Sequence, residues 1–117
     1  MNRFKAKMNG VEMKMLAMVT VNVARSINPV VNIQELVSVD VMERIWSRMR
    51  NMYRPDKDRY TVQFSSVEAM VITDYIVPAM MTSDDAVLMS FGSRIRQELY
   101  NQVNRECNIY NAMNYGR

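Results

Sequence analysis

The most basic stretch of the chain is RIWSRMRNMYRPDKDR, residues 44–59. Around Trp46, the only tryptophan, it holds six basic residues: Arg44, Arg48, Arg50, Arg54, Lys57 and Arg59. Five of them are arginine, whose planar guanidinium can form paired hydrogen bonds to phosphate or guanine. The stretch therefore predicts a nucleic-acid contact. The alternative is a solvated helix face, since Glu43, Asp56 and Asp58 lie close enough to neutralise part of the charge.

A second basic group lies at the N-terminus. Arg3, Lys5 and Lys7 alternate along the sequence and would project from one side of a strand, in line with phosphates spaced along a nucleic-acid backbone. Charge is also unevenly spread, because the first 30 residues carry a net +4 and the last 58 a net −2. We expect the three N-terminal residues to be further nucleic-acid contacts.

Residues that could support catalysis or bind a metal are scarce. The chain has no histidine, which is the commonest general base near neutral pH and the commonest metal ligand. Its one cysteine, Cys107, has no second cysteine to pair with, and its three glycines are too scattered to form a phosphate-binding loop. We therefore expect a non-enzymatic protein with no catalytic residue, no metal site and no cofactor.

A helix is predicted to carry the basic stretch. Asp40 and Glu43 have the spacing of a capping box, and Pro55 ends the helix at Tyr53 or Arg54. Between these signals the apolar residues follow helical spacing: Met42, Ile45, Trp46, Met49, Met52 and Tyr53.

On this helix the aromatic and basic side chains separate. Trp46 and Tyr53 fall on the apolar stripe, whereas Arg44 and Arg48 lie on the opposite face. We therefore expect both rings to be core residues rather than platforms for base stacking. The interleaving of aromatic and basic residues would then be a feature of the sequence and not of the surface.

Near the N-terminus the sequence predicts a β-hairpin. Asn9-Gly10 supplies the two residues that a type I′ turn requires. After it, the odd positions from Val11 to Val23 are apolar, which is a strand period. Residues 30–38 indicate a further short strand.

After the basic stretch, residues 59–64 read as a strand. Ser65 and Glu68 then form a second capping box, which favours a helix ending near Pro78. The β-branched residues of 69–77 leave a strand as the alternative.

Thr82 and Asp85 open the last predicted helix, and Gly92 is a place where it could break. Its apolar stripe runs through Leu88, Phe91, Ile95, Leu99, Val103, Cys107 and Tyr110. Residues 1–117 are thus expected to form one α+β domain. It would consist of an N-terminal β-hairpin or small antiparallel sheet packed on two or three α-helices, with a long C-terminal helix.

Thirteen methionines are spread over all the predicted elements. The first interpretation is adaptable core filling, and the alternative is a Met-rich surface for protein partners. The most exposed part of such a surface would be PAMM, residues 78–81, which lies between predicted elements. The free edge of the hairpin could also pair with a second copy. Self-association and a host protein are therefore expected partners beside nucleic acid.

No apolar run approaches the ~20 residues that a membrane-spanning helix needs. The nearest candidate, MLAMVTVNVA (15–24), is interrupted by Thr20 and Asn22, and Glu12 precedes it. We expect no membrane partner and a cytoplasmic location, in the host cytoplasm if the protein is viral.

Four short segments, VTVNVAR (19–25), WSRMRNMY (46–53), VQFSSVE (62–68) and YIVP (75–78), together resemble the histone-like double-stranded-DNA-binding early protein of small Bacillus phages. The resemblance spans about sixty residues, with gaps. It implies a non-catalytic, self-associating protein that binds DNA through its backbone and shape, and it favours a strand at 69–77. The chain departs from that family in lacking an acidic C-terminal tail.

Two functions follow as hypotheses. The first is a small phage or mobile-element protein that binds nucleic acid as a homodimer or larger assembly through the basic residues named above. The second is a viral assembly subunit or an inhibitor, acting by protein–protein interaction through the Met-rich surface and the sheet edge.

Overall fold

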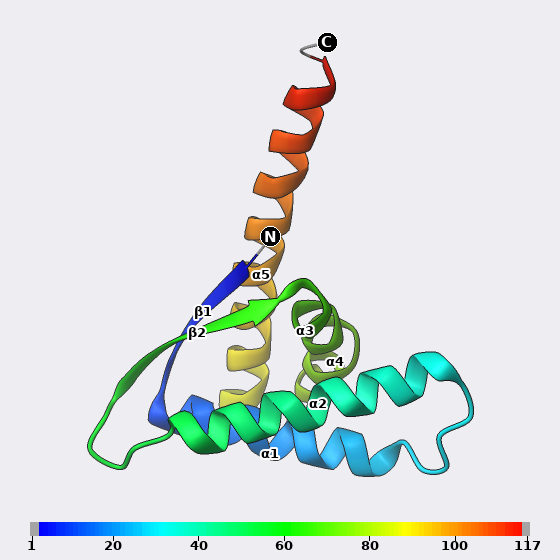
Figure 1. The fold of residues 1–117 in the computed structure, drawn as a ribbon. Helices are drawn as coiled ribbons and strands as arrows, with labels where there is room; N and C mark the ends of the chain where they lie inside the picture. The colour runs from blue at the N-terminus through cyan, green and yellow to red at the C-terminus, as the bar shows by residue number, and fades with distance from the viewer. Residues whose placement is uncertain (1–2, 116–117) are drawn as a thin grey trace.

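The sheet pairs two strands that come from distant parts of the chain (Figure 1). The computed structural model describes residues 3–115, and side chains for residues 4–103. Strand β1 (Arg3–Asn9) pairs in antiparallel register with β2 (Arg59–Ser65), so that Ala6 faces Val62. Alternate residues of both strands are buried, which places one face of the sheet on the core. The strand predicted at 59–64 and the small antiparallel sheet are confirmed.

The predicted hairpin at Asn9-Gly10 is wrong, because Asn9 caps a helix. The Asn9 side chain accepts a hydrogen bond from the Glu12 amide at 2.8 Å, and the Glu12 carboxylate accepts one from the Asn9 amide at 2.9 Å. This reciprocal pair starts α1 (Gly10–Ser26) where a strand was expected. Ten of the fourteen residues from Val11 to Ala24 are apolar, and the ones that α1 buries, Met13, Leu16 and Val19, are three residues apart, so the sequence was compatible with a helix as well.

The predicted short strand at 30–38 is also wrong. Helix α2 (Ile33–Met52) starts there, with the Asn32 side chain accepting a hydrogen bond from the Glu35 amide at 2.8 Å. Helix α2 therefore begins two turns before the expected start at Asp40. Its end at Met52, with Tyr53 as the C-cap, confirms the predicted stop before Pro55.

The segment after β2 is helical, as favoured. The Ser65 and Glu68 capping box is present and starts α3 (Ser66–Val71), which continues through the π-helical turn η1 (Ile72–Ile76) into α4 (Val77–Met81). The strand that the phage-protein resemblance favours at 69–77 is not formed. The segment also runs past Pro78, because the wider π-turn before it accommodates a ring that would clash with a regular helix.

Helix α5 (Ala86–Tyr115) begins close to its predicted start, although Asp85 rather than Thr82 is the cap. The Asp85 carboxylate accepts hydrogen bonds from the next turn, at 2.9 Å from Val87. The helix does not break at Gly92. A Cβ at Gly92 would lie only 2.8 Å from the Met80 Cβ, so glycine allows α4 and α5 to approach closely.

The predicted apolar stripe of α5 is buried over its first half: Leu88, Phe91, Ile95 and Leu99. Val103 is 39% exposed, and the side chains of Cys107 and Tyr110 lie outside the described residues. The C-terminal half of α5 extends away from the rest of the fold (Figure 1). The predicted α+β class with a long C-terminal helix is confirmed.

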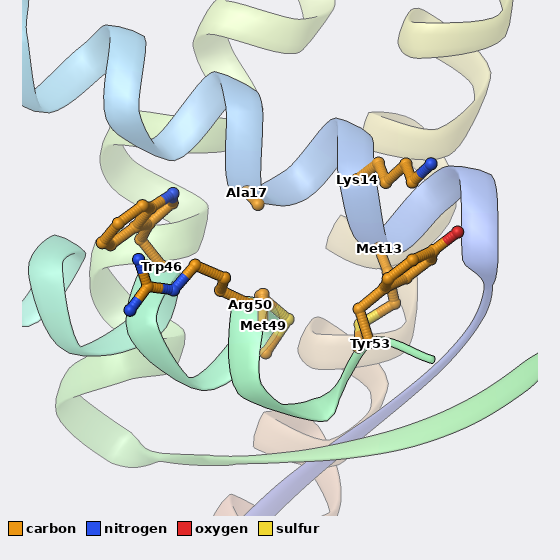
Figure 2. Close-up of a pocket in the computed structure, with 7 residues that line it drawn as sticks. All are labelled: Met13, Lys14, Ala17, Trp46, Met49, Arg50 and Tyr53. Atoms are coloured by element: carbon orange, nitrogen blue, oxygen red, sulfur yellow. The ribbon is translucent and has the colours of Figure 1, made fainter. Parts of the chain in front are cut away.

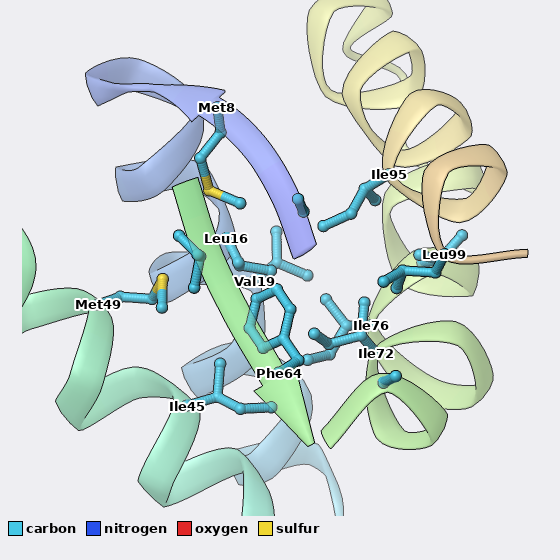
Figure 3. Close-up of a cluster of buried hydrophobic side chains, with 14 of the residues drawn as sticks. Met8, Leu16, Val19, Ile45, Met49, Phe64, Ile72, Ile76, Ile95 and Leu99 are labelled. Carbon is cyan, nitrogen blue, oxygen red and sulfur yellow. The ribbon is translucent and has the colours of Figure 1, made fainter. Parts of the chain in front are cut away.

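One core holds the elements together, with the Phe64 ring near its centre (Figure 3). Its side chains come from the sheet and from every helix. Several methionines belong to it, which confirms core filling: Met8, Met13, Met42, Met49 and Met80. PAMM was expected to be exposed, and this is wrong for Met80, which is fully buried between α4 and its neighbours.

Within the part of the chain that the structure describes, no helix combines the length and apolar character needed to cross a bilayer.

Candidate nucleic-acid interface

Cations and aromatic rings meet where α1 begins and α2 ends. We call six residues there the basic–aromatic cluster: Lys14, Trp46, Arg50, Tyr53, Lys57 and Tyr60. Lys14 Nζ lies 4.7 Å from the centroid of the Tyr53 ring. The Arg50 guanidinium carbon lies 4.7 Å from the Trp46 ring, and Lys57 Nζ lies 4.9 Å from the Tyr60 ring. The aromatic and basic residues are therefore interleaved in space, contrary to expectation.

The loop between α2 and β2 is held against the first turn of α1. The Tyr60 hydroxyl accepts a hydrogen bond from the Arg54 amide at 2.9 Å and lies 3.2 Å from the Lys57 carbonyl oxygen, to which it can donate. The Tyr60 ring stacks on Tyr53 with centroids 6.5 Å apart. A Cβ at Gly10 would lie 3.6 Å from both the Tyr53 ring and the Lys57 carbonyl, so this corner is closely packed.

A groove between α1 and α2 opens beside the cluster (Figure 2). It has a volume of about 200 Å³, and no acidic side chain is among its lining residues: Met13, Lys14, Ala17, Trp46, Met49, Arg50 and Tyr53. Trp46 and Tyr53 stand at its two ends, with Arg50 between them (Figure 2). A second hollow, of about 180 Å³, shares Trp46 and is lined further along by Val21, Arg25 and Glu43. The groove is thus apolar at its floor and basic at its rim.

The two rings at the ends of the groove are only partly buried. Tyr53 packs against the core, whereas Trp46 does not belong to it. The prediction that both are core residues is therefore wrong for Trp46 and holds only in part for Tyr53. Both rings present a face or edge to the groove, where a planar ligand could contact them.

The N-terminal basic residues lie on the exposed face of the sheet. Lys5 and Lys7 point away from the core, and Arg59 joins them from β2, opposite Asn9. The Arg3 side chain lies outside the described residues. A hollow of about 510 Å³ beside them includes Glu12 and Asp58. This face therefore carries mixed charge and is less basic than the groove.

The predicted row of Arg44 and Arg48 is divided by the structure. Arg48 forms an ion pair with Glu68 and donates a hydrogen bond to the Gln63 carbonyl at 2.7 Å, so it joins α2 to β2 and α3. Arg44 is exposed on the side of α2 away from the groove, beside Asp40 and Glu43. The Arg54 guanidinium donates hydrogen bonds to the carbonyls at the end of α2, and its distance to the Asn51 carbonyl oxygen is 2.7 Å.

Glu68, the partner of Arg48, is buried. Burial of the carboxyl group raises its pKa, but the Ser65 amide and the Arg48 guanidinium donate hydrogen bonds to it and outweigh that effect. The pKa of Glu68 is therefore held below its ordinary value of 4.5. Glu68 stays ionised at neutral pH and fixes Arg48 in place.

The cations of the cluster have no carboxylate partner among the residues whose side chains are described. Ion pairs within that set involve only Arg48, with Glu68, and Arg94, with Glu12 and Glu98. None of these cations is therefore held in an ion pair with a described carboxylate, and a polyanion could bind them.

The outer edge of β1 is covered by α5, which corrects the expectation that a sheet edge is open there. Gln102 both accepts from the Lys5 amide and donates to the Lys5 carbonyl, each at 2.8 Å. Glu98 accepts from the Lys7 amide at 3.2 Å, and Arg94 donates to the Lys7 carbonyl at 2.8 Å. Arg94, Glu98 and Gln102 are four residues apart, and this spacing in the sequence predicts that they form one polar row on a helix. Such a row can pair with the free backbone groups of a strand edge.

A search for known protein families found no match to this chain, and searches of curated proteins and of solved structures found none either. The resemblance to the phage early protein stays a prediction.

Proposed function

We propose that this chain is a nucleic-acid-binding protein without enzymatic activity, and that the basic–aromatic cluster is its contact surface. One observation carries the proposal: three cations from three segments, Lys14, Arg50 and Lys57, each lie within 5 Å of an aromatic ring and none has a carboxylate partner among the described side chains. Nucleic acid is the ligand class that offers phosphates for such cations and flat bases for the two partly exposed rings, Trp46 and Tyr53, whereas the Tyr60 ring is buried and positions Lys57.

In this proposal the cations supply most of the affinity. Each phosphate that a lysine or arginine neutralises releases condensed counterions, and this release favours binding at low salt. Lys5, Lys7 and Arg59 on the sheet face would extend the path of the backbone beyond the cluster. Arg48 takes no part, because Glu68 and Gln63 already occupy its guanidinium.

The proposal is tested by titrating a fluorescent oligonucleotide of random sequence with the wild-type chain and measuring anisotropy at several salt concentrations. The three cluster contacts to a single strand should make the logarithm of the binding constant fall with the logarithm of salt at a slope of about −2, and contacts at Lys5, Lys7 and Arg59 would make the slope steeper. Binding that is absent at the lowest salt, or that does not change with salt, would contradict the proposal.

A second candidate function, protein–protein interaction, rests on a different surface. We call it the apolar tip, formed by the loop before α2 and the first turns of that helix: Val30, Val31, Ile33, Leu36 and Val37. Val31 is 72% exposed and Ile33 is 79% exposed. Exposed apolar residues that are grouped in this way often mark a contact surface for another protein. Self-association through this tip would make the protein a homo-oligomer, which light scattering on the same samples would measure.

A further inference from the structure

We infer that the groove between α1 and α2 receives unpaired bases, so that the preferred ligand is single-stranded rather than duplex nucleic acid. This inference rests on the proposed function and narrows its ligand. It also departs from what the phage-protein resemblance implies, since that family binds double-stranded DNA.

The size and lining of the groove suit one flat ring. Its volume of about 200 Å³ is below the ~300–1,000 Å³ of sites that enclose a whole small-molecule ligand. Met13, Ala17 and Met49 line it with apolar surface, on which a base can lie but a phosphate cannot. A base is therefore the part of a nucleotide that fits the groove, and the phosphates stay at its basic rim.

The spacing of the two rings matches a short run of nucleotides. Trp46 and Tyr53 are seven residues apart on α2, which places them about 10 Å apart along the helix axis. One strand of B-form DNA advances ~3.4 Å per nucleotide along the duplex axis, and an unstacked single strand advances further, so at most about three nucleotide steps separate the two rings. A cation accompanies each ring, Arg50 at Trp46 and Lys14 at Tyr53, so a base against either ring would have a phosphate-binding side chain beside it.

A duplex could use only part of this surface. In a duplex the flat faces of the bases are stacked on one another, and the grooves expose only base edges. The cations could still bind duplex phosphates, but neither ring could stack. Arg50 has no ion pair to hold it in the described structure, so its guanidinium can leave the indole for a phosphate when a base arrives.

The test compares a 15-nucleotide single strand with a duplex of the same sequence and length, using the full-length protein. Anisotropy gives the affinity, and the emission of Trp46, the only tryptophan, reports stacking at the groove itself. We expect at least tenfold tighter binding of the single strand and quenching of Trp46 by that strand alone. We expect Trp46→Ala to weaken single-strand binding about tenfold and leave duplex binding within twofold. Trp46→Phe, which keeps a ring in the groove, should retain most of the affinity.

The other outcomes separate the two claims. Equal affinity for the two forms, with no quenching of Trp46, would overturn this inference and leave the proposed function standing. No binding of either form would remove the proposed function and the inference with it. If Trp46→Ala does not fold, the wild-type quenching and the Trp46→Phe variant still decide the question, because a strand that binds without quenching Trp46 does not stack there.

Discussion

Replacing Lys14, Arg50 and Lys57 together with alanine is expected to weaken single-stranded nucleic-acid binding about a hundredfold at low salt. The three cations come from α1, α2 and the following loop, and they flank one surface. Each charge-assisted contact contributes on the order of 1 kcal/mol, and every 1.4 kcal/mol is about tenfold in affinity. The same change should reduce the salt slope by about 2, because each lost contact to a single strand removes ~0.7.

A second triple variant controls for net charge. Arg25, Arg44 and Arg96 are exposed and form no ion pair with a described residue, and their replacement by alanine lowers the net charge by the same three units. None of them belongs to the basic–aromatic cluster and only Arg25 lines the neighbouring hollow, so we expect about a threefold loss of affinity, mainly through the general field of the protein. Equal losses in the two triple variants would show that binding depends on total charge and not on the cluster.

The Arg48→Ala variant is expected to lower the free energy of unfolding by about 3 kcal/mol. Removing this arginine leaves the Glu68 carboxylate buried without its ion-pair partner, and the Gln63 carbonyl loses a donor. Arg48 is itself about one-third exposed, which places the effect at the lower end of the range for buried ion pairs. Urea unfolding followed by circular dichroism would measure it.

The matched control is Arg44→Ala, one turn earlier on α2. Arg44 is exposed and has no ion pair among the described residues, so its loss should change stability by less than ~0.5 kcal/mol.

The pH dependence of stability provides a further check on the Arg48–Glu68 ion pair. Because the folded pKa of Glu68 is lowered, its contribution is fully present above pH 4.5 and is lost as the pH falls through the folded pKa. In Arg48→Ala this loss on acidification should shrink, and similar stabilities for Arg48→Ala and Arg44→Ala would contradict the assigned ion pair.

Local signals in the sequence predicted the second half of the fold well. The capping residues Ser65 and Glu68 indicated the helix of 66–81, and the apolar stripe predicted the buried face of α5. The prediction of the first half was wrong where the apolar residues fit both the two-residue period of a strand and the 3.6-residue period of a helix. Ten of the fourteen residues from Val11 to Ala24 are apolar, including even positions such as Leu16 and Met18, so alternation could not distinguish a strand from a helix. The decisive signal was the Asn9 and Glu12 cap, which competed with the Asn-Gly turn at the same place.

The candidate site was harder to predict because it is assembled from distant segments. Arg50, Trp46 and Lys57 lie inside the basic stretch that the sequence singled out. Lys14 reaches Tyr53 only because α1 and α2 form an antiparallel pair, which the predicted strand at 11–23 excluded. The role of Arg48 depends on Glu68, twenty residues later and on another element, so no spacing rule within one helix could assign it.

The measurement that tests the central claim most directly is the mapping of a bound oligonucleotide by NMR. Backbone amide shifts of the 13.7 kDa chain would be followed while a short single strand is added. We predict that the largest changes occur at residues 10–17 and 46–60, around the basic–aromatic cluster, together with the indole N–H of Trp46. Changes confined to the apolar tip at residues 30–37, or spread evenly over all the exposed cations, would contradict the cluster as the nucleic-acid contact.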